Sequence, residues 1–221
     1  MSLLLWMACA PAYRFPGPLG SLGSEDVPDA PAPSVPVARP SGGGAEIAEI
    51  AAGFVGASAI VLDGTRYRWD CSGLVEAALA GAGCAYRGSS AMLFEAARDA
   101  GVLHRRRRPQ PGDVAFFDDT YDRDGNGRVD DPLSHVAVVE AVDEDGTIGL
   151  VHVGSKGVVR FVMNLRHPDV RDDADGKRLN DYLRAKGSDD GPRTRYLAGE
   201  LWVAFGSFWK AEPAVADRST R

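Results

Sequence analysis

The chain has 221 residues, of which 44% are hydrophobic and 25% charged, a composition typical of a soluble chain with one full core. The formal net charge of −6 provides no basic field, so we exclude nucleic acid as a partner. Three cysteines without CxxC spacing, no HExxH motif and no G-x-S-x-G elbow argue against a disulfide scaffold, a zinc centre and a catalytic serine.

The chain begins with an apolar stretch that is too short to span a bilayer. Residues 1–12, which open with MSLLLWMACA, resemble the end of a secretory signal that starts upstream of Met1. The letters LWMAC also resemble a lipoprotein cleavage box, with Cys9 as the lipidated residue. We therefore expect an exported protein of the periplasm or cell envelope, anchored to the membrane through Cys9. A plain disordered N-terminus is the alternative.

A sharp change of composition separates this opening from the folded part. Eight of the 14 prolines fall between Ala10 and Gly44, and PSGGG closes the stretch. Such a segment cannot bury enough apolar surface to offset its chain entropy, so residues 13–44 are predicted to be a disordered tether. Residues 211–221 are predicted to be a disordered tail, which leaves residues 45–210 as the domain.

Three helices are predicted at the start of the domain. The first covers residues 45–57, the second starts at the letters DCSG and ends at Gly81–Gly83, and the third covers residues 89–101 from a Ser cap to a terminal Gly. Helical spacing places the following residues toward the core in the first two helices: Ile47, Ile50, Ala51, Phe54, Leu74, Val75, Ala78 and Leu79.

Strands follow the helices. Apolar runs predict them at residues 114–117, 135–142, 147–153 and 157–163. A polar excursion after Asn164 contains a further predicted helix, GKRLNDYLRAK at 176–186, and residues 199–209 supply a final strand. Helices first and antiparallel strands afterwards indicate an α+β fold. The basic run HRRRR before the first strand is interpreted as a solvated loop, with contact to an anionic polymer as the alternative.

Cys71, in the stretch YRWDCSGLV, is the candidate nucleophile. Asp70 or Ser72 can cap the helix that starts there, so the sulfur lies where unpaired N–H groups and the positive end of the dipole favour an anion. The thiolate is the reactive form, and this position predicts a lowered pKa for Cys71. A core residue is the alternative interpretation. Cys84 has no partner motif and is predicted to be a buried, inert thiol.

A cysteine nucleophile needs a base and an orienting group, and two of the four histidines lie in predicted strands. If Val142 faces Thr147 across the hairpin, Ala137 faces His152, and His135 shares the face of Ala137. The two imidazoles then project from the same side as diagonal neighbours that can interact. Two unrelated strand histidines are the alternative.

The motifs DCSGLV, PGDVAFF, SHVAVVEAV and LVHVGSKGV occur in an order that resembles the NlpC-like cell-wall peptidases, which have a papain-like fold. The resemblance runs from about residue 45 to residue 163, with LAGELWVAFG as a closing strand. It implies that Cys71 is the nucleophile, His135 the general base and His152 the residue that orients it. It also implies that Tyr67 helps at the oxyanion site, although the Gly-Gly loop that normally follows this Tyr is missing.

The resemblance implies covalent catalysis without a cofactor. The thiolate attacks an amide carbonyl, N–H groups of Cys71 and Ser72 hold the oxyanion, and His135 protonates the leaving amine. The implied bond joins D-glutamate to the diamino acid of peptidoglycan stem peptides, and a monomer is expected. The alternatives are an amidase for the muramoyl–L-alanine bond with the same site, acyl transfer to or from lipids, and a non-catalytic, calcium-dependent wall-binding module.

The stretch DRDGNGRVDD resembles a calcium-binding loop, because oxygen ligands alternate around a Gly at position 6. Position 12 should be Glu and is Leu133, so the bidentate ligand is missing unless Asp131 replaces it. A run of Asx turns is the alternative. The predicted ligands of this structural Ca²⁺ are Asp122, Asp124, Asn126, Arg128 through its carbonyl, Asp130 and Asp131.

Overall fold

The computed structural model of the protein describes residues 43–188 and 190–211. The predicted signal or lipoprotein segment, including Cys9, lies outside these residues. So do all but the last two residues of the predicted tether and all but the first residue of the predicted tail. None of the described helices is long and apolar enough to cross a membrane.

Three helices precede the main sheet: α1 at Gly43–Gly53, α2 at Cys71–Gly81 and α3 at Ser90–Asp99. Seven of the eight positions predicted to face the core are buried, and the eighth, Ile50, is half-buried against the same cluster. Asp70 caps α2 by accepting the N–H of Gly73 at 2.7 Å. Ser89 caps α3 in the same way.

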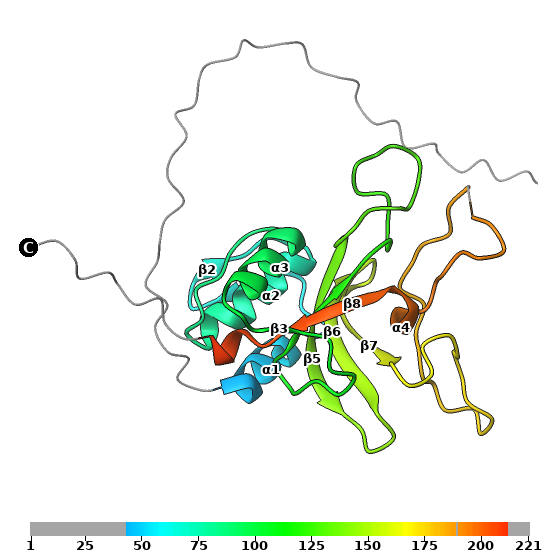
Figure 1. The fold of residues 1–221 in the computed structure, drawn as a ribbon. Helices are drawn as coiled ribbons and strands as arrows, with labels where there is room; N and C mark the ends of the chain where they lie inside the picture. Colours follow the sequence, from blue (N-terminus) through cyan, green and yellow to red (C-terminus); the bar gives the residue numbers. More distant parts are fainter. Residues whose placement is uncertain (1–42, 189, 212–221) are drawn as a thin grey trace, which may run out of the picture. The chain divides into compact units, whose positions relative to one another are not determined.

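A six-stranded antiparallel sheet forms the centre of the fold (Figure 1). Across the sheet its strands run β3-β8-β4-β5-β6-β7. In chain order they are β3 Leu103–His104, β4 Val114–Phe117, β5 His135–Val142, β6 Thr147–Gly154, β7 Gly157–Asn164 and β8 Trp202–Gly206. A short hairpin, β1 Val61–Leu62 and β2 Thr65–Arg66, precedes α2. The predicted α+β fold is confirmed.

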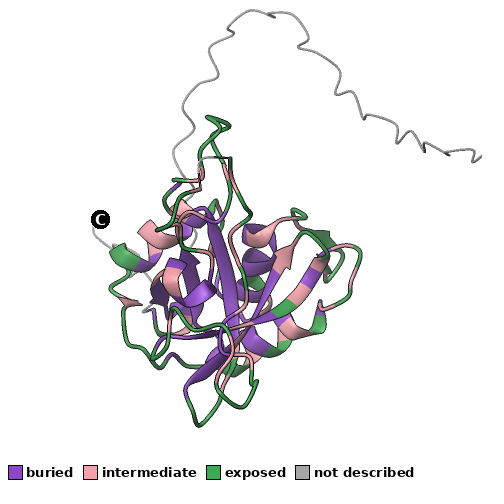
Figure 2. Ribbon diagram, turned by 90° about the vertical axis from the view of Figure 1, so that its right-hand side faces the viewer, coloured by how far each residue is buried: buried purple, intermediate pink, exposed green. Residues whose placement is uncertain are grey.

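Both faces of the sheet are covered, which explains why all four residues of β4 are buried. Helices α1 to α3 lie over one face, and the segment between β7 and β8 lies over the other (Figure 1). Alternate strand residues therefore enter two separate apolar clusters, Phe116 and Val136 on the helix side, and Phe117 and Ala137 on the opposite side. Figure 2 shows the long central strands as mostly buried.

The helix predicted over residues 176–186 is wrong, because this stretch is irregular. Tertiary hydrogen bonds hold it in place of helical ones, and Asn180 lies at their centre with no exposed surface. Its Nδ2 donates to the carbonyls of His167 and Val170, and its Oδ1 accepts the N–H groups of Asn164 and Gly199. Asn favours such side-chain to backbone bonds over a helix interior.

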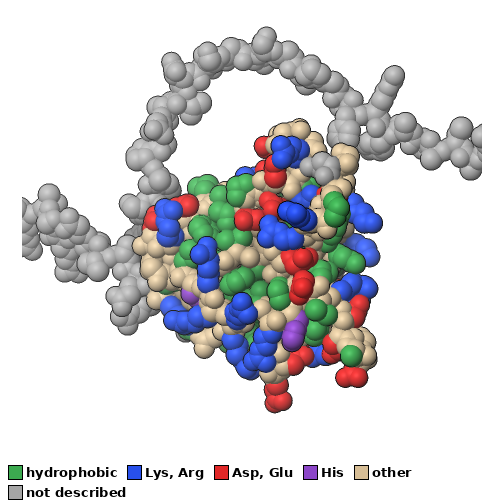
Figure 3. Space-filling model, turned by 45° about the vertical axis from the view of Figure 1, so that its right-hand side comes forward, with side chains coloured by type: hydrophobic (Ala, Val, Ile, Leu, Met, Phe, Trp, Pro, Cys, Tyr) green, Lys and Arg blue, Asp and Glu red, His purple; other side chains and the backbone are tan. Residues whose placement is uncertain are grey.

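The last predicted strand, at 199–209, is shorter than expected. The one-turn helix α4 (Ala198–Leu201) precedes β8, and a 3-10 turn, Phe208–Lys210, follows it. The arginine run 105–108 is exposed, as predicted for a solvated loop. Basic and acidic side chains are interspersed on the face shown in Figure 3, as the modest net charge leads one to expect.

Candidate active site

Cys71 is the first residue of α2 and is partly exposed. The chain before it folds back tightly over the helix start, so that a side chain at Gly73 would collide with the carbonyl of Arg68. Gly73 is therefore required by this close approach of the backbone. The capping carboxylate of Asp70 fixes the direction in which α2 leaves the loop.

The predicted lowering of the Cys71 pKa is not what the structure gives. Burial raises the pKa of the Cys71 thiol, and the neighbouring Asp70 carboxylate raises it further. Hydrogen bonds with the backbone of Val136 and with Ser72 act in the opposite direction without outweighing the burial. The resting sulfur is therefore a thiol at neutral pH.

The hairpin that carries the two histidines departs from the predicted register at one end and follows it at the other. Val142 faces Ile148 rather than Thr147, because Gly146 at φ 88° closes a three-residue loop. A bulge between Val139 and Ala141 then shifts the register back. The two irregularities cancel, so the pairing at the histidine end is the predicted one.

The imidazoles of His135 and His152 meet as predicted. His135 Nε2 lies 2.8 Å from His152 Nδ1, and the ring planes are 88° apart. Both residues are buried, with exposed fractions of 8% and 9%. Because one ring nitrogen must donate and the other accept, this bond fixes the tautomers of the pair relative to each other. It leaves Nδ1 of His135 available for the sulfur.

Both imidazoles are neutral at neutral pH. Burial lowers the pKa of His135 to about 3, and the neighbouring His152 lowers it further. Burial also lowers the pKa of His152 to about 4, against an opposing effect of the Asp181 carboxylate. The apolar surroundings include the ring of Phe161, whose centroid lies 4.5 Å from that of His152.

Cys71, His135 and His152 line one cleft of about 600 Å³. Its walls come from segments far apart in the sequence: residues 69–71, 120–121, 152–156 and 182–185. Tyr67 does not line it, and packs instead against the core cluster beside α2. Ser72 is buried in the first turn of α2 and also stays outside the lining.

In a comparison with models of protein families, residues 62–153 match the CHAP domain, and this range includes Cys71, His135 and His152. This is a cysteine amidase and peptidase type of domain in the papain-like class, so the broader class implied by the sequence motifs is confirmed, whereas the NlpC-like family itself is not. Searches of the curated proteins and of the solved structures found no match.

Three exposed aromatic residues on the cleft were not predicted as site residues. Trp69 lies two residues before Cys71, Tyr121 begins the acidic loop, and Tyr182 belongs to the segment that was predicted as a helix. Their exposed fractions are 45%, 44% and 64%. The sequence does not show whether an aromatic residue in a loop is exposed or buried. Only Trp69 could have been placed near the site, because YRW directly precedes the motif that contains Cys71.

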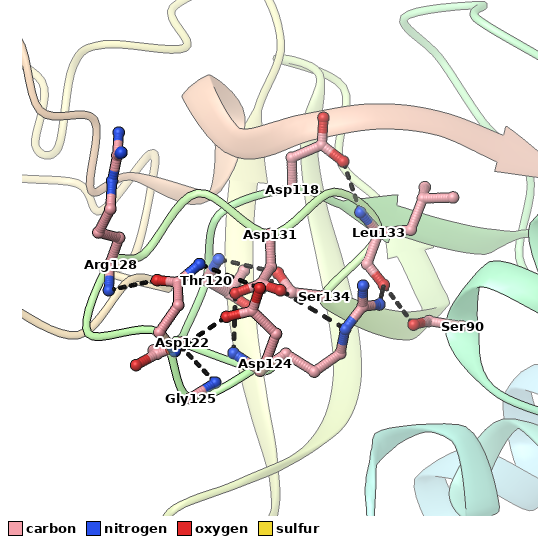
Figure 4. A network of polar contacts seen from close by, with 12 residues as sticks. Ser90, Asp118, Thr120, Asp122, Asp124, Gly125, Arg128, Asp131, Leu133 and Ser134 are labelled. Atoms are coloured by element: carbon pink, nitrogen blue, oxygen red, sulfur yellow. Dashed lines mark hydrogen bonds and ion pairs between the residues drawn. The ribbon is translucent and has the colours of Figure 1, made fainter.

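The acidic loop brings together three of the four carboxylates among the predicted calcium ligands (Figure 4). Asp122, Asp124 and Asp131 each offer a carboxylate oxygen within 4.8 Å of the others. Asp130 is not part of this cluster, and Asn126 is bound to it, because its Nδ2 donates to Asp124 Oδ2 at 3.0 Å. Asn126 Oδ1 accepts the N–H of Arg128, and Asp130 forms an ion pair with the Arg128 side chain at 3.1 Å. Three converging carboxylates have the hard oxygen donors that suit Ca²⁺.

The acidic loop is tied to the strand that carries His135. Thr120, which lines the cleft, donates its N–H to Ser134 Oγ at 2.9 Å, and the two hydroxyl oxygens lie 2.8 Å apart. The N–H of Leu133 donates to Asp118 at 2.7 Å (Figure 4). These bonds hold the start of the acidic loop to Ser134, the residue next to His135, which is the candidate general base.

Proposed function

We propose that this protein is a cysteine hydrolase that cleaves amide bonds in peptidoglycan stem peptides, between D-glutamate and the diamino acid. The observation that carries the proposal is the cleft lined by Cys71, His135 and His152, with the imidazoles joined at 2.8 Å. The match to CHAP domains supports it, because these are generally cysteine- and histidine-dependent peptidoglycan hydrolases.

In the proposed mechanism the resting thiol keeps its proton until an amide enters the cleft. Nδ1 of His135 then takes the proton as Sγ of Cys71 attacks the carbonyl carbon, which gives a tetrahedral oxyanion and an imidazolium. The first N–H groups of α2, which have no partner within the helix, are the candidate oxyanion donors. His152 accepts the Nε2–H of His135 and thereby orients the imidazolium.

In the second half of the mechanism, Nδ1 of His135 returns its proton to the leaving amine, and the C–N bond breaks to leave a thioester on Cys71. A water molecule then loses a proton to the same nitrogen and attacks the thioester. Departure of the acid restores the thiol. None of these reaction steps needs a bound cofactor.

The test is digestion of purified peptidoglycan sacculi, followed by identification of the new amine ends. We expect new α-amino groups on the diamino acid and none from Cys71→Ala. New L-alanine amino ends would replace the proposed bond with the muramoyl–L-alanine bond. Absence of any new amine with the unaltered protein would contradict hydrolysis and favour a wall-binding module.

We also propose that the loop cluster of Asp122, Asp124 and Asp131 binds a structural Ca²⁺ that stiffens the approach to His135. The ion would supply charge neutralisation for the three carboxylates and takes part in no bond-breaking step. Because peptidoglycan lies outside the cytoplasmic membrane, we further propose that the protein acts as an exported monomer of the cell envelope. Its attachment through a lipid on Cys9 rests on the sequence alone.

A further inference from the structure

The exposed aromatic residues of the domain are gathered on the cleft. Among residues 43–188 and 190–211, Trp69, Tyr121 and Tyr182 are the large aromatic residues with exposed side chains, and all three line the space that contains Cys71. They belong to three segments that are distant from one another in the sequence. Large aromatic side chains that stay exposed together at one concave site indicate a surface that a ligand covers.

The indole of Trp69 lies at the turn between β6 and β7. A Cβ built on Gly157 would be 3.6 Å from Cζ2 of Trp69, so one edge of the ring packs against this glycine. Ser155 and Lys156 are the exposed residues of the same turn, and they also line the cleft. An aromatic face with a hydroxyl and an ammonium group close by is therefore open to a ligand.

The ring of Tyr182 is carried by the segment that leads from β7 to β8. Its backbone is fixed on both sides, because the N–H of Asp181 donates to Val162 at 3.0 Å and the N–H of Leu183 donates to Tyr196 at 2.9 Å. The guanidinium carbon of Arg171 lies 5.2 Å from the ring centroid. A fixed backbone beneath a largely exposed ring describes a stacking platform rather than a core residue.

The proposed substrate has only one kind of surface that suits such rings. Its peptide part contains L-alanine, D-glutamate and a diamino acid, none of which has a ring or a large apolar side chain. Its glycan part consists of pyranose sugars, whose C–H groups form an apolar face and whose hydroxyl and acetamido groups form a polar edge. The electron-rich face of an aromatic ring attracts such C–H groups. Sugars therefore fit these rings better than the peptide does.

We propose that Trp69 and Tyr182 bind sugar rings of the glycan strand to which the stem peptide is attached. The inference takes its ligand from the proposed function and adds that the substrate is a peptide still linked to glycan, not a released peptide. The distances that the chains can span agree. Trp69 is two residues from Cys71, so their Cα atoms are at most about 7 Å apart. L-alanine and D-glutamate likewise separate the sugar from the proposed scissile bond by two residues.

Titration of the full chain with a chitin tetrasaccharide, four β-1,4-linked N-acetylglucosamine units, tests the site by calorimetry. We expect saturable binding that Trp69→Ala and Tyr182→Ala each weaken by about tenfold, as for the loss of one stacked ring. Trp69→Phe and Tyr182→Phe keep a ring and should retain most of the affinity. Tyr121 is a less decisive position, because it precedes Asp122 and its replacement would also disturb the acidic loop.

Met92→Ala is the matched control, because Met92 is an exposed hydrophobic residue on α3 that does not line the cleft. This variant should bind the tetrasaccharide like the unaltered chain. The alanine variants replace exposed side chains and should fold, which their melting temperatures check. Absence of saturable binding, or equal affinities of the unaltered chain and both alanine variants, would overturn the inference.

A second titration separates the sugar from the peptide. In the inactive Cys71→Ala chain, a stem tripeptide joined to its disaccharide should bind about tenfold more tightly than the same tripeptide without sugars. Equal affinities would assign the rings to the peptide and overturn the inference. Sugar binding without new amine ends from sacculi would contradict the proposed hydrolysis alone. New amine ends without sugar binding would contradict this inference alone.

Discussion

The position of one proton decides how Cys71 works. The start of a helix favours a thiolate, and that argument is visible in the letters DCSG. The burial of the sulfur is not visible there, and it raises the pKa of Cys71. The low pKa of His135 acts in the same direction, because a neutral imidazole cannot hold a thiolate as an ion pair.

We therefore expect alkylation of Cys71 by iodoacetamide to accelerate about tenfold per pH unit between roughly pH 6 and 9, because the reactive thiolate fraction rises by this factor below the pKa. Mass spectrometry of the alkylated peptides measures the rates. Cys84 is the internal control. It is fully buried, with a pKa raised to about 11, and should react far more slowly at every pH. A rate for Cys71 that is constant over this range would show a thiolate–imidazolium pair instead.

Asp113 of the PGD motif has a structural role that its place in a family motif does not reveal. The carboxylate is 1% exposed and accepts hydrogen bonds from Ser207 at 2.6 Å and from the backbone N–H of Gln110 at 2.8 Å. His104 and Trp209 each place a ring nitrogen 3.2 Å from it. It thus connects β3, the start of β4 and the turn after β8.

Asp113→Ala should lower the free energy of unfolding by about 3 kcal/mol or more, since its buried partners would lose their acceptor. Urea unfolding followed by tryptophan fluorescence measures this. Asp99→Ala, at the exposed end of α3, should change the stability little. A loss for Asp113→Ala no larger than that of the control would contradict the role of Asp113 in connecting these elements.

Among the elements, the three long helices and the long strands could be predicted closely, because period and caps are local signals. The hairpin of β5 and β6 shows the limit of such reasoning. Its loop and its bulge each break the predicted pairing, and only their cancellation places His135 beside His152. The helix predicted at 176–186 fails for a related reason, since the partners of Asn180 are distant in sequence.

The acidic loop is the element whose order should depend on an ion. We expect Ca²⁺ to raise the melting temperature and the hydrolytic activity, and a chelator to lower both, because three close carboxylates repel one another without a cation. Asp124→Asn should weaken the response to Ca²⁺. Asp173→Asn, in an exposed turn of the excursion, is the matched control. If chelator and Ca²⁺ leave both quantities unchanged, the loop is a run of Asx turns.

For the whole molecule, the cleft exists because the sheet brings four separated segments to one place. The order of motifs in the sequence predicts the thiol and the imidazoles. The wall formed by residues 182–185 depends on how the segment after β7 folds over the sheet, and no local pattern encodes that path. The least predictable part of the chain therefore shapes one wall of the cleft.

Stability of the folded domain should decrease as the pH falls from about 6.5 to about 4. In the unfolded chain the two histidines bind protons with a pKa near 6.5, whereas in the fold their pKa values are lowered to about 3 and 4. The unfolded state therefore takes up more protons in this range, and stability is complete above pH 6.5 and is lost below it. The two shifts together correspond to on the order of 6 kcal/mol at pH 4. Urea unfolding between pH 4 and pH 7.5 measures how steeply the free energy of unfolding changes with pH. We expect His152→Gln to make this dependence weaker. His167→Gln, in the segment after β7, is the control and should leave it unchanged. A free energy of unfolding that stays constant over this range would mean that the imidazole pair is not buried in neutral form.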